Sequence, residues 1–228
     1  MKWLVRIAVV IVVLLVVADF GARIVVENVA GRALASRRGF NGEVDVGFGG
    51  FPFLLALMDR HFDEVTVTAE DVRSGGFTGT AVADGPEIRV DSVRFEMQDV
   101  TVTGDLWGDD PNREVTAAEG SGRAVVRQSA LNQLVPAEYD LRLTLLQDTV
   151  RITGTAPQLP QAGTQTVEVP SDQVRLEAST LVVPAPAPVG EIRIPLPELA
   201  EGVEFESVGV TRGEIDLTFS VRGLRLEL

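Results

Sequence analysis

The chain has 228 residues, no cysteine and a net charge of −13 at neutral pH, from 20 basic and 33 acidic side chains. This charge has the wrong sign for wrapping a polyanion, so we expect no nucleic-acid partner. The absence of cysteine excludes disulfides, thiolate metal sites, a cysteine nucleophile and an acylated lipoprotein cysteine. The length favours one large domain.

The N-terminus has the layout of a signal peptide or a signal anchor. Lys2 and Arg6 precede an uncharged apolar run, Ile7–Ala18, which ends at Asp19. The run is shorter than the about 20 residues of a membrane span, so cleavage before Asp19 and retention as an anchor both fit. The flanking charges predict that everything after Asp19 lies outside the cytoplasmic membrane, in the cell envelope. The alternative is a buried helix of a cytosolic protein.

The next segment, residues 20–35, has helical periodicity. Its apolar positions are Phe20, Ile24, Val29, Ala33 and Leu34, and its polar positions are Arg23, Glu27, Asn28 and Arg32. We expect an amphipathic helix that continues from the membrane segment. Arg37 and Arg38, followed by a glycine, predict its end.

The stretch Gly47–Met58 reads Gly-Phe-Gly-Gly-Phe-Pro-Phe-Leu-Leu-Ala-Leu-Met, with eight consecutive apolar residues after a glycine cluster. Pro52 suits the start of a helix, so Phe53–Met58 is predicted to form one or two helical turns. A helix that is apolar all round must be covered on every side. The stretch therefore either plugs a protein core or lines a space for an apolar ligand.

Most of the remaining chain alternates between apolar and polar residues, as strands do. Predicted strands include Val44–Phe48, Val65–Ala69, Ile88–Met97, Val100–Val102, Val115–Val126, Leu141–Leu145, Val150–Ile152, Val167–Ala178, Leu181–Val183, Val203–Val210 and Ile215–Val221. A parity shift at Asp91–Ser92 predicts a β-bulge, and a second shift precedes Val100. Gln147–Asp148 predicts a hairpin turn, and Ser129–Val135 a short helix with Ser129 as a candidate N-cap.

The segment Gly104–Arg113 is the clearest loop signal and divides residues 20–103 from residues 114–228. The proline-rich Pro184–Gly190 cannot lie in a central strand, and Pro195–Leu199 predicts a turn or one helical turn. About ten strands with few helices give a mainly β, α+β fold. Such a sheet must roll up on itself, form a sandwich or enclose a ligand.

We find no catalytic or metal-binding constellation. The single histidine, His61, lies between Asp59 and Asp63, but further metal ligands have no sequence signal, and a solvated loop histidine is the simpler interpretation. Ser121 lacks the flanking glycines of a nucleophile elbow, and the glycines near Gly47 lack the lysine of a phosphate-binding loop. We therefore assign no catalytic residue, no metal ligand and no cofactor.

Two segments carry a family resemblance: Val46–Leu54 with the following Phe62–Val67, and the C-terminal Val203–Gly213. Across residues 20–228 the chain resembles the LmeA-like phospholipid-binding family of actinobacterial cell-envelope proteins. The resemblance implies a long, strongly curved antiparallel sheet around a hydrophobic lipid groove, similar to tubular lipid-binding and AsmA-like folds. For a well-known relative it also implies periplasmic phospholipase activity and a role in building mannosylated glycolipids.

Three hypotheses follow. The protein carries or presents phospholipid at the outer face of the cytoplasmic membrane for envelope glycolipid biogenesis, hydrolyses lipid as a phospholipase, or is a ligand-free β-sandwich for protein interaction. We favour the first, with segment 1–19 as signal peptide or anchor and residues 20–228 as the lipid-binding domain. The predicted lipid-binding residues are Phe48, Phe51, Pro52, Phe53, Leu54, Leu57, Met58, Val65 and Val67.

Overall fold

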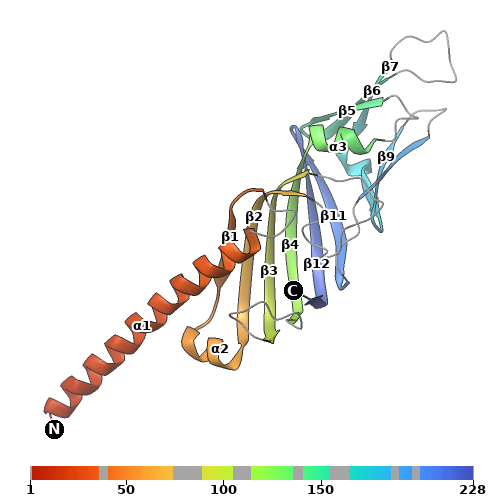
Figure 1. Cartoon of the computed structure of the whole chain (residues 1–228). Coiled ribbons are helices and arrows are strands. Elements are labelled where there is room, and N and C mark those ends of the chain that lie inside the picture. The colour runs from red at the N-terminus through yellow and green to blue at the C-terminus, as the bar shows by residue number, and fades with distance from the viewer. Residues whose placement is uncertain are drawn as a thin grey trace.

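The computed structural model describes residues 2–35, 41–73, 89–104, 114–135, 141–154, 165–185, 190–196 and 201–227. In these residues the chain is mainly β, with antiparallel sheets, a long N-terminal helix and two short α-helices (Figure 1). The predicted mainly β class is therefore confirmed. The helix end predicted at Arg37 and Arg38, most of the loop predicted over residues 104–113, and residues 186–189 and 197–199 of the two proline-containing segments lie outside the described residues.

A six-stranded antiparallel sheet forms the body of the molecule. Its strands, in spatial order, are β1 (Val44–Phe48), β2 (His61–Arg73), β3 (Arg89–Thr103), β4 (Glu114–Arg127), β12 (Glu214–Glu227) and β11 (Val203–Thr211). Strands from both sides of the predicted loop lie next to each other, because β3 pairs with β4. Strand β4 in turn pairs with β12. The sheet thus joins the two ends of the sequence.

Two three-stranded sheets lie at one end of the body (Figure 1). One contains β5 (Leu141–Leu146), β6 (Thr149–Gly154) and β7 (Gln165–Pro170), and the other β8 (Arg175–Glu177), β9 (Thr180–Pro184) and β10 (Glu191–Pro195). The predicted hairpin turn at Gln147–Asp148 is confirmed, with Asp148 in the left-handed region at φ 60°. The single strand predicted over residues 167–178 is wrong, because a 3-10 turn, Ser171–Gln173, follows Pro170 and separates β7 from β8.

The α-helices are α1 (Lys2–Ala35), α2 (Phe53–Asp59) and α3 (Gln128–Leu134). Helix α1 packs along β1, and its N-terminal part extends beyond the sheet (Figure 1). In the described part of the chain, no helix combines the length and the apolar character needed to cross a bilayer.

Helix α3 covers the edge of strand β5 with two amide side chains. Gln128 Oε1 accepts a hydrogen bond from the Leu145 N–H at 2.7 Å, and the Asn132 amide bonds both the N–H and the C=O of Leu143. These groups substitute for a neighbouring strand, which protects an otherwise open edge. The predicted N-cap role of Ser129 is wrong, because Arg127 occupies that position and makes no side-chain cap bond.

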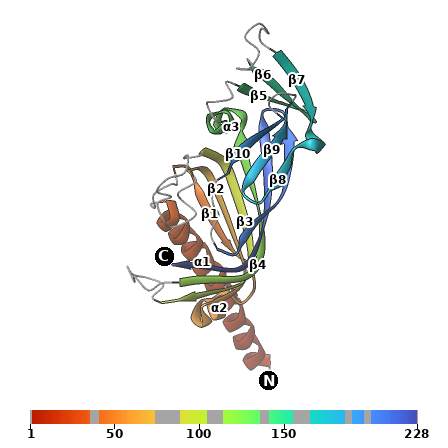
Figure 2. The same ribbon diagram turned by 90° about the vertical axis from the view of Figure 1, so that its right-hand side faces the viewer.

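In four neighbouring strands the alternation of buried and exposed residues shifts by one position. The four shifts lie at one common level of the sheet. Pairing skips one position in each strand there, at Asp63, Asp99, Ala118 and Gly223, yet the register is the same on both sides. Asp99 and Gly223 adopt left-handed φ angles of 52° and 61°. We call this level the parity line; Figure 2 shows the lower ends of the strands turned toward the side on which α1 lies.

The parity shift predicted before Val100 is therefore confirmed, and the shift at Asp91–Ser92 is present as well. The β-bulge predicted at Asp91–Ser92 is wrong. A bulge places two residues opposite one and changes the register, whereas the pairing of β3 with β2 is unchanged across this point. Instead Asp71, on the facing strand, takes a left-handed φ of 49°, which aspartate tolerates better than most residues.

The apolar side chains form two clusters. The upper cluster joins one end of the six-stranded sheet to α3 and both small sheets, with Leu143, Leu181 and Ile194 fully buried. The lower cluster joins the other end to α1 and α2, with Phe53 and Phe62 at its centre. Phe95 and Val203 contact both clusters. The two cores therefore meet on one face of the large sheet.

Candidate functional site

The glycine- and phenylalanine-rich stretch connects β1 to β2 through α2. The Gly49 N–H donates to the Glu64 carbonyl at 2.8 Å, which holds the stretch against β2 after β1 has ended at Phe48. Helix α2 begins at Phe53, directly after Pro52, and Arg60 ends it in a left-handed conformation with φ 56°. The predicted short helix after Pro52 is therefore confirmed.

The expectation that this helix is covered on every side is wrong. Three aromatic rings pack inward: Phe48 and Phe62 lie 4.8 Å apart between centroids, and Phe53 lies 5.7 Å from Phe48. On the other side Phe51, Leu55 and Met58 are exposed, at 65%, 56% and 78%. One stretch thus supplies both a buried plug and an exposed apolar surface.

A carboxylate from α1 caps the N-terminus of α2. Asp19 Oδ2 accepts from the Phe53 N–H at 3.0 Å and Oδ1 from the Leu54 N–H at 2.7 Å. Pro52 has no side-chain acceptor to offer, so Asp19 takes the role of an N-cap side chain from a distant segment. The negative charge also complements the positive end of the helix dipole. Asp19 is 5% exposed and is the one buried charged residue among those described.

A second carboxylate ties α1 to the same stretch. Glu27 Oε1 accepts from the Phe48 N–H at 3.1 Å and pairs with Arg23 Nε at 2.9 Å. Asp19, Arg23 and Glu27 are spaced by four residues, so they form one stripe along the helix. The end of β1 and the start of α2 are therefore both positioned by α1.

Of the predicted apolar set of α1, Leu34 contacts the lower core, whereas Phe20, Ile24 and Val29 are exposed. Ala22, Val26 and Ala30, which lie outside that set, pack there as well. The reason is close approach: a Cβ at Gly31 would lie 2.5 Å from the Val44 carbonyl oxygen, so a face of small residues is required. The larger apolar residues are left on the outside.

One face of the six-stranded sheet carries three rows of apolar residues that cross all six strands. The central row is Val46, Val67, Phe95, Gly122, Phe219 and Phe205; the row below it is Phe48, Val65, Met97, Gly120, Val221 and Val203; the row above it is Val44, Ala69, Val93, Ala124, Leu217 and Val208. We call these residues the apolar face. It is continuous from edge to edge.

The apolar face is incompletely buried near its middle and at one edge. Val67, Phe95, Val203, Phe205 and Val208 are half-buried, although the rows around them are buried. The Phe219 ring lies over Gly122, where a Cβ would come within 1.9 Å of its Cε2 atom, and 4.8 Å from the Phe95 ring. An apolar surface that stays partly accessible is a candidate for a ligand or partner site.

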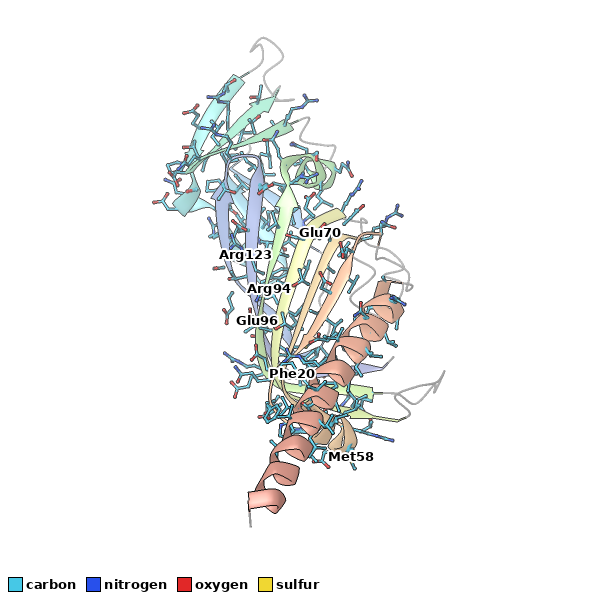
Figure 3. The ribbon with its side chains drawn as sticks, turned by 90° about the vertical axis from the view of Figure 1, so that its left-hand side faces the viewer. Phe20, Met58, Glu70, Arg94, Glu96 and Arg123 are labelled. Carbon is cyan, nitrogen blue, oxygen red and sulfur yellow. The ribbon has the colours of Figure 1, made fainter. Side chains whose placement is uncertain are left out.

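The opposite face of the sheet is polar. Arg94 pairs with Glu96 at 2.8 Å, and Arg123 with Asp216 at 2.7 Å, all from exposed or half-exposed positions. Figure 3 shows Arg94, Glu96 and Arg123 projecting from this part of the sheet. The sheet therefore has one solvated face and one apolar face, as the alternation predicted.

The nine predicted lipid-binding residues do not form one surface. Phe48, Phe53 and Val65 are buried in the lower core; Leu54, Leu57 and Val67 are half-buried; Phe51, Pro52 and Met58 are exposed. Phe48, Val65 and Val67 belong to the apolar face, and the others belong to α2 and the turn before it.

His61 lies on the polar face, at the start of β2. Its Nδ1 is 3.2 Å from the Thr101 hydroxyl and its Nε2 is 3.6 Å from Asp99 Oδ1, both on the neighbouring strand. The sequence neighbours Asp59 and Asp63 are not its partners in these contacts. Among the described residues no group of three or more histidine, aspartate or glutamate side chains could hold a metal ion.

The sequence did not identify the residues that complete the site. The pattern around Phe95, Phe205 and Phe219 predicted strands only, because no local feature of the sequence shows which strands are neighbours in the sheet. Asp19 was interpreted as the end of the membrane segment, although its carboxylate is part of the folded domain. A lone acidic residue after an apolar run carries no signal for capping a helix that begins far along the chain.

Comparison with known proteins gives one result. The model of the LmeA-like phospholipid-binding family matches residues 17–220, which include most of α1's packed part, the whole stretch around α2 and nearly all of the apolar face. No curated protein and no solved structure matches the chain. Because the match covers most of the sequence, the chain belongs to the LmeA-like phospholipid-binding family.

Proposed function

We propose that this protein carries or presents a phospholipid on the apolar face of its six-stranded sheet, at the outer face of the cytoplasmic membrane, for the biogenesis of envelope glycolipids. The observation that carries the proposal is the partly accessible centre of three apolar rows on a sheet whose other face is charged. Membership of a phospholipid-binding family supplies the class of ligand.

In this proposal the sheet curves around the acyl chains and forms a groove. Support comes from the parity line, where four strands change direction at the same level without a change in register. Val67, Phe95 and Val203 would contact the acyl chains. Phe48, Phe53 and Val65 would form the floor, while Phe51, Pro52, Leu54, Leu57 and Met58 would lie at the open end.

A carrier role agrees with the energetics of an apolar site. Burial of an acyl chain stabilises the complex by about 0.8 kcal/mol per methylene relative to water, but a bilayer provides the same burial. Transfer from membrane to protein is therefore close to neutral and reversible. A protein that binds lipid in this way releases it as readily as it takes it up.

The test compares two variants of neighbouring residues in β2. Val67→Gln places a polar group on the apolar face, and Thr66→Gln is the matched control on the polar face. We expect native mass spectrometry to find co-purified phospholipid on the wild type and the control and much less on Val67→Gln, with all three folded by circular dichroism. Equal lipid content in both variants, or none on the wild type, would refute the proposal.

Two further measurements address the phospholipase alternative and the location. A carrier releases no labelled fatty acid from phospholipid, whereas a hydrolase does. For location, a reporter that is active only outside the cytoplasm, fused after the last residue, should be active. Activity of a cytoplasm-only reporter at that position would contradict the proposed side of the membrane.

A further inference from the structure

Exposed apolar residues surround the N-terminal part of α1. Val12, Val13, Leu14, Leu15 and Val17 are each 55% or more exposed. At 3.6 residues per turn, positions 12 to 17 cover the whole circumference of the helix. A protein partner or a second copy of the chain would cover one side of such a helix, whereas a bilayer covers every side.

A second exposed apolar surface lies beside the point where α1 leaves the domain. Leu55 and Met58 are three residues apart, on one side of α2, and Phe51 precedes them. The two hydrogen bonds that Asp19 accepts from the Phe53 and Leu54 N–H groups fix α2 to α1 one residue before the exposed Phe20. Figure 3 places Phe20 and Met58 at the same end of the domain, from which α1 projects.

We infer that α2 is a membrane-docking element, which together with the exposed apolar residues within 12–17 of α1 seats the domain on a bilayer. Phe51, Leu55 and Met58 enter the boundary between headgroups and acyl chains, the depth at which interfacial helices lie. The inference deepens the proposed function, on which it rests for placing the protein at a membrane. It also brings the lower end of the apolar face to the lipid surface.

The net charge of the chain favours docking through apolar contacts over docking through charged headgroups. The chain carries a net charge of −13, so a membrane rich in anionic lipid repels the protein as a whole. Docking through Phe51, Leu55 and Met58 needs no headgroup charge. It is therefore expected on neutral phosphatidylcholine and is insensitive to salt, in contrast to docking by a basic patch.

The absence of native cysteine allows a direct test, because one introduced thiol is a unique labelling site. The full chain with Met58→Cys, labelled with an environment-sensitive fluorophore, is reconstituted into phosphatidylcholine vesicles that contain spin-labelled phospholipid. Asp172→Cys, an exposed position in the 3-10 turn after β7, is the matched control. We expect a blue-shifted emission at position 58 and a loss of its fluorescence with spin labels near the headgroup end of the acyl chain, with neither effect at position 172.

Emission at position 58 that matches position 172, with no quenching by lipid, overturns the inference. A blue shift without quenching by lipid, together with a protein-concentration dependence, shows that a second copy covers α2 and also overturns it. Leu55→Cys, on the same side of α2, must reproduce the result for position 58. The bound-lipid measurement is separate, because docking at position 58 without co-purified phospholipid contradicts the carrier function and leaves the docking inference standing.

Discussion

The cap that Asp19 provides for α2 can be removed by Asp19→Ala. The substitution removes both acceptors for the Phe53 and Leu54 N–H groups, and Pro52 at the capping position makes no side-chain cap bond. Because Glu27 holds only the end of β1, nothing else from α1 bonds the start of α2 in the described contacts. We therefore expect α2 and the aromatic plug to become less stable together.

The magnitude follows from the burial of the two bonds. The Phe53 N–H is buried, so an unpaired donor there costs about 1–3 kcal/mol. The bond to Leu54 is partly buried and water replaces some of it, so its loss costs about 0.5–1.5 kcal/mol. The two costs together amount to about 1.5–4.5 kcal/mol, which is a large part of the about 5–15 kcal/mol by which a domain is stable.

The assay is urea unfolding of the full chain in detergent, followed by circular dichroism, with hydrogen exchange of the α2 amides as a local readout. Asp45→Ala, an exposed position on β1, removes the same charge without removing a cap. We expect a lower midpoint for Asp19→Ala than for Asp45→Ala, and faster exchange at Phe53 and Leu54. If the two variants have equal midpoints and equal exchange at α2, the capping argument is refuted.

Three further predictions concern other parts of the sheet. Gly122→Val forces a Cβ into the Phe219 ring and should lower the free energy of unfolding by about 1–3 kcal/mol through overpacking. Gly47→Val, where a Cβ meets nothing within 4 Å, is the control. Equal melting temperatures of the two variants would contradict the packing. His61→Ala should keep the bound lipid and change stability by less than about 0.5 kcal/mol, as expected for an exposed side chain; loss of lipid or of a hydrolase activity would give His61 a functional role. Hydrogen bonds from Arg193 and then Arg175 lower the pKa of Glu177, so its contribution is present above the ordinary pKa of 4.5 and is lost as the pH falls through the lowered value. The melting temperatures of the wild type and Glu177→Gln should therefore differ at neutral pH and converge in acid, and a difference that persists in acid would contradict the ion pairs as its source.

Local patterns in the sequence predicted the elements well, because each depends on residues close together in the chain. The alternation at Val44, Val46 and Phe48 gave β1, and Pro52 before an apolar run gave α2. The partners of these elements were not predictable in the same way. The three apolar rows depend on which strands are neighbours, and β4 lies beside β12, far along the sequence.

The orientation of α1 shows why hydrophobicity alone was misleading. Phe20, Ile24 and Val29 have the larger apolar surface and belong to the predicted apolar side of the helix. Packing against β1 instead requires contact between backbones, which Gly31 and the alanines of the opposite side permit. Which side of α1 approaches β1 is therefore information that the periodicity of a single helix does not contain.

The parity line has a consequence for how this sheet tolerates changes in length. A residue inserted into β3 above Asp99 would move the left-handed position out of alignment with Asp63, Ala118 and Gly223 on the neighbouring strands. Every side chain between the insertion and the end of the strand would then exchange faces, which would bring charged residues such as Arg94 and Glu96 into the core. Insertions and deletions among relatives should therefore fall beyond the strand ends, and a single internal deletion should be rescued only by matching deletions in the adjoining strands.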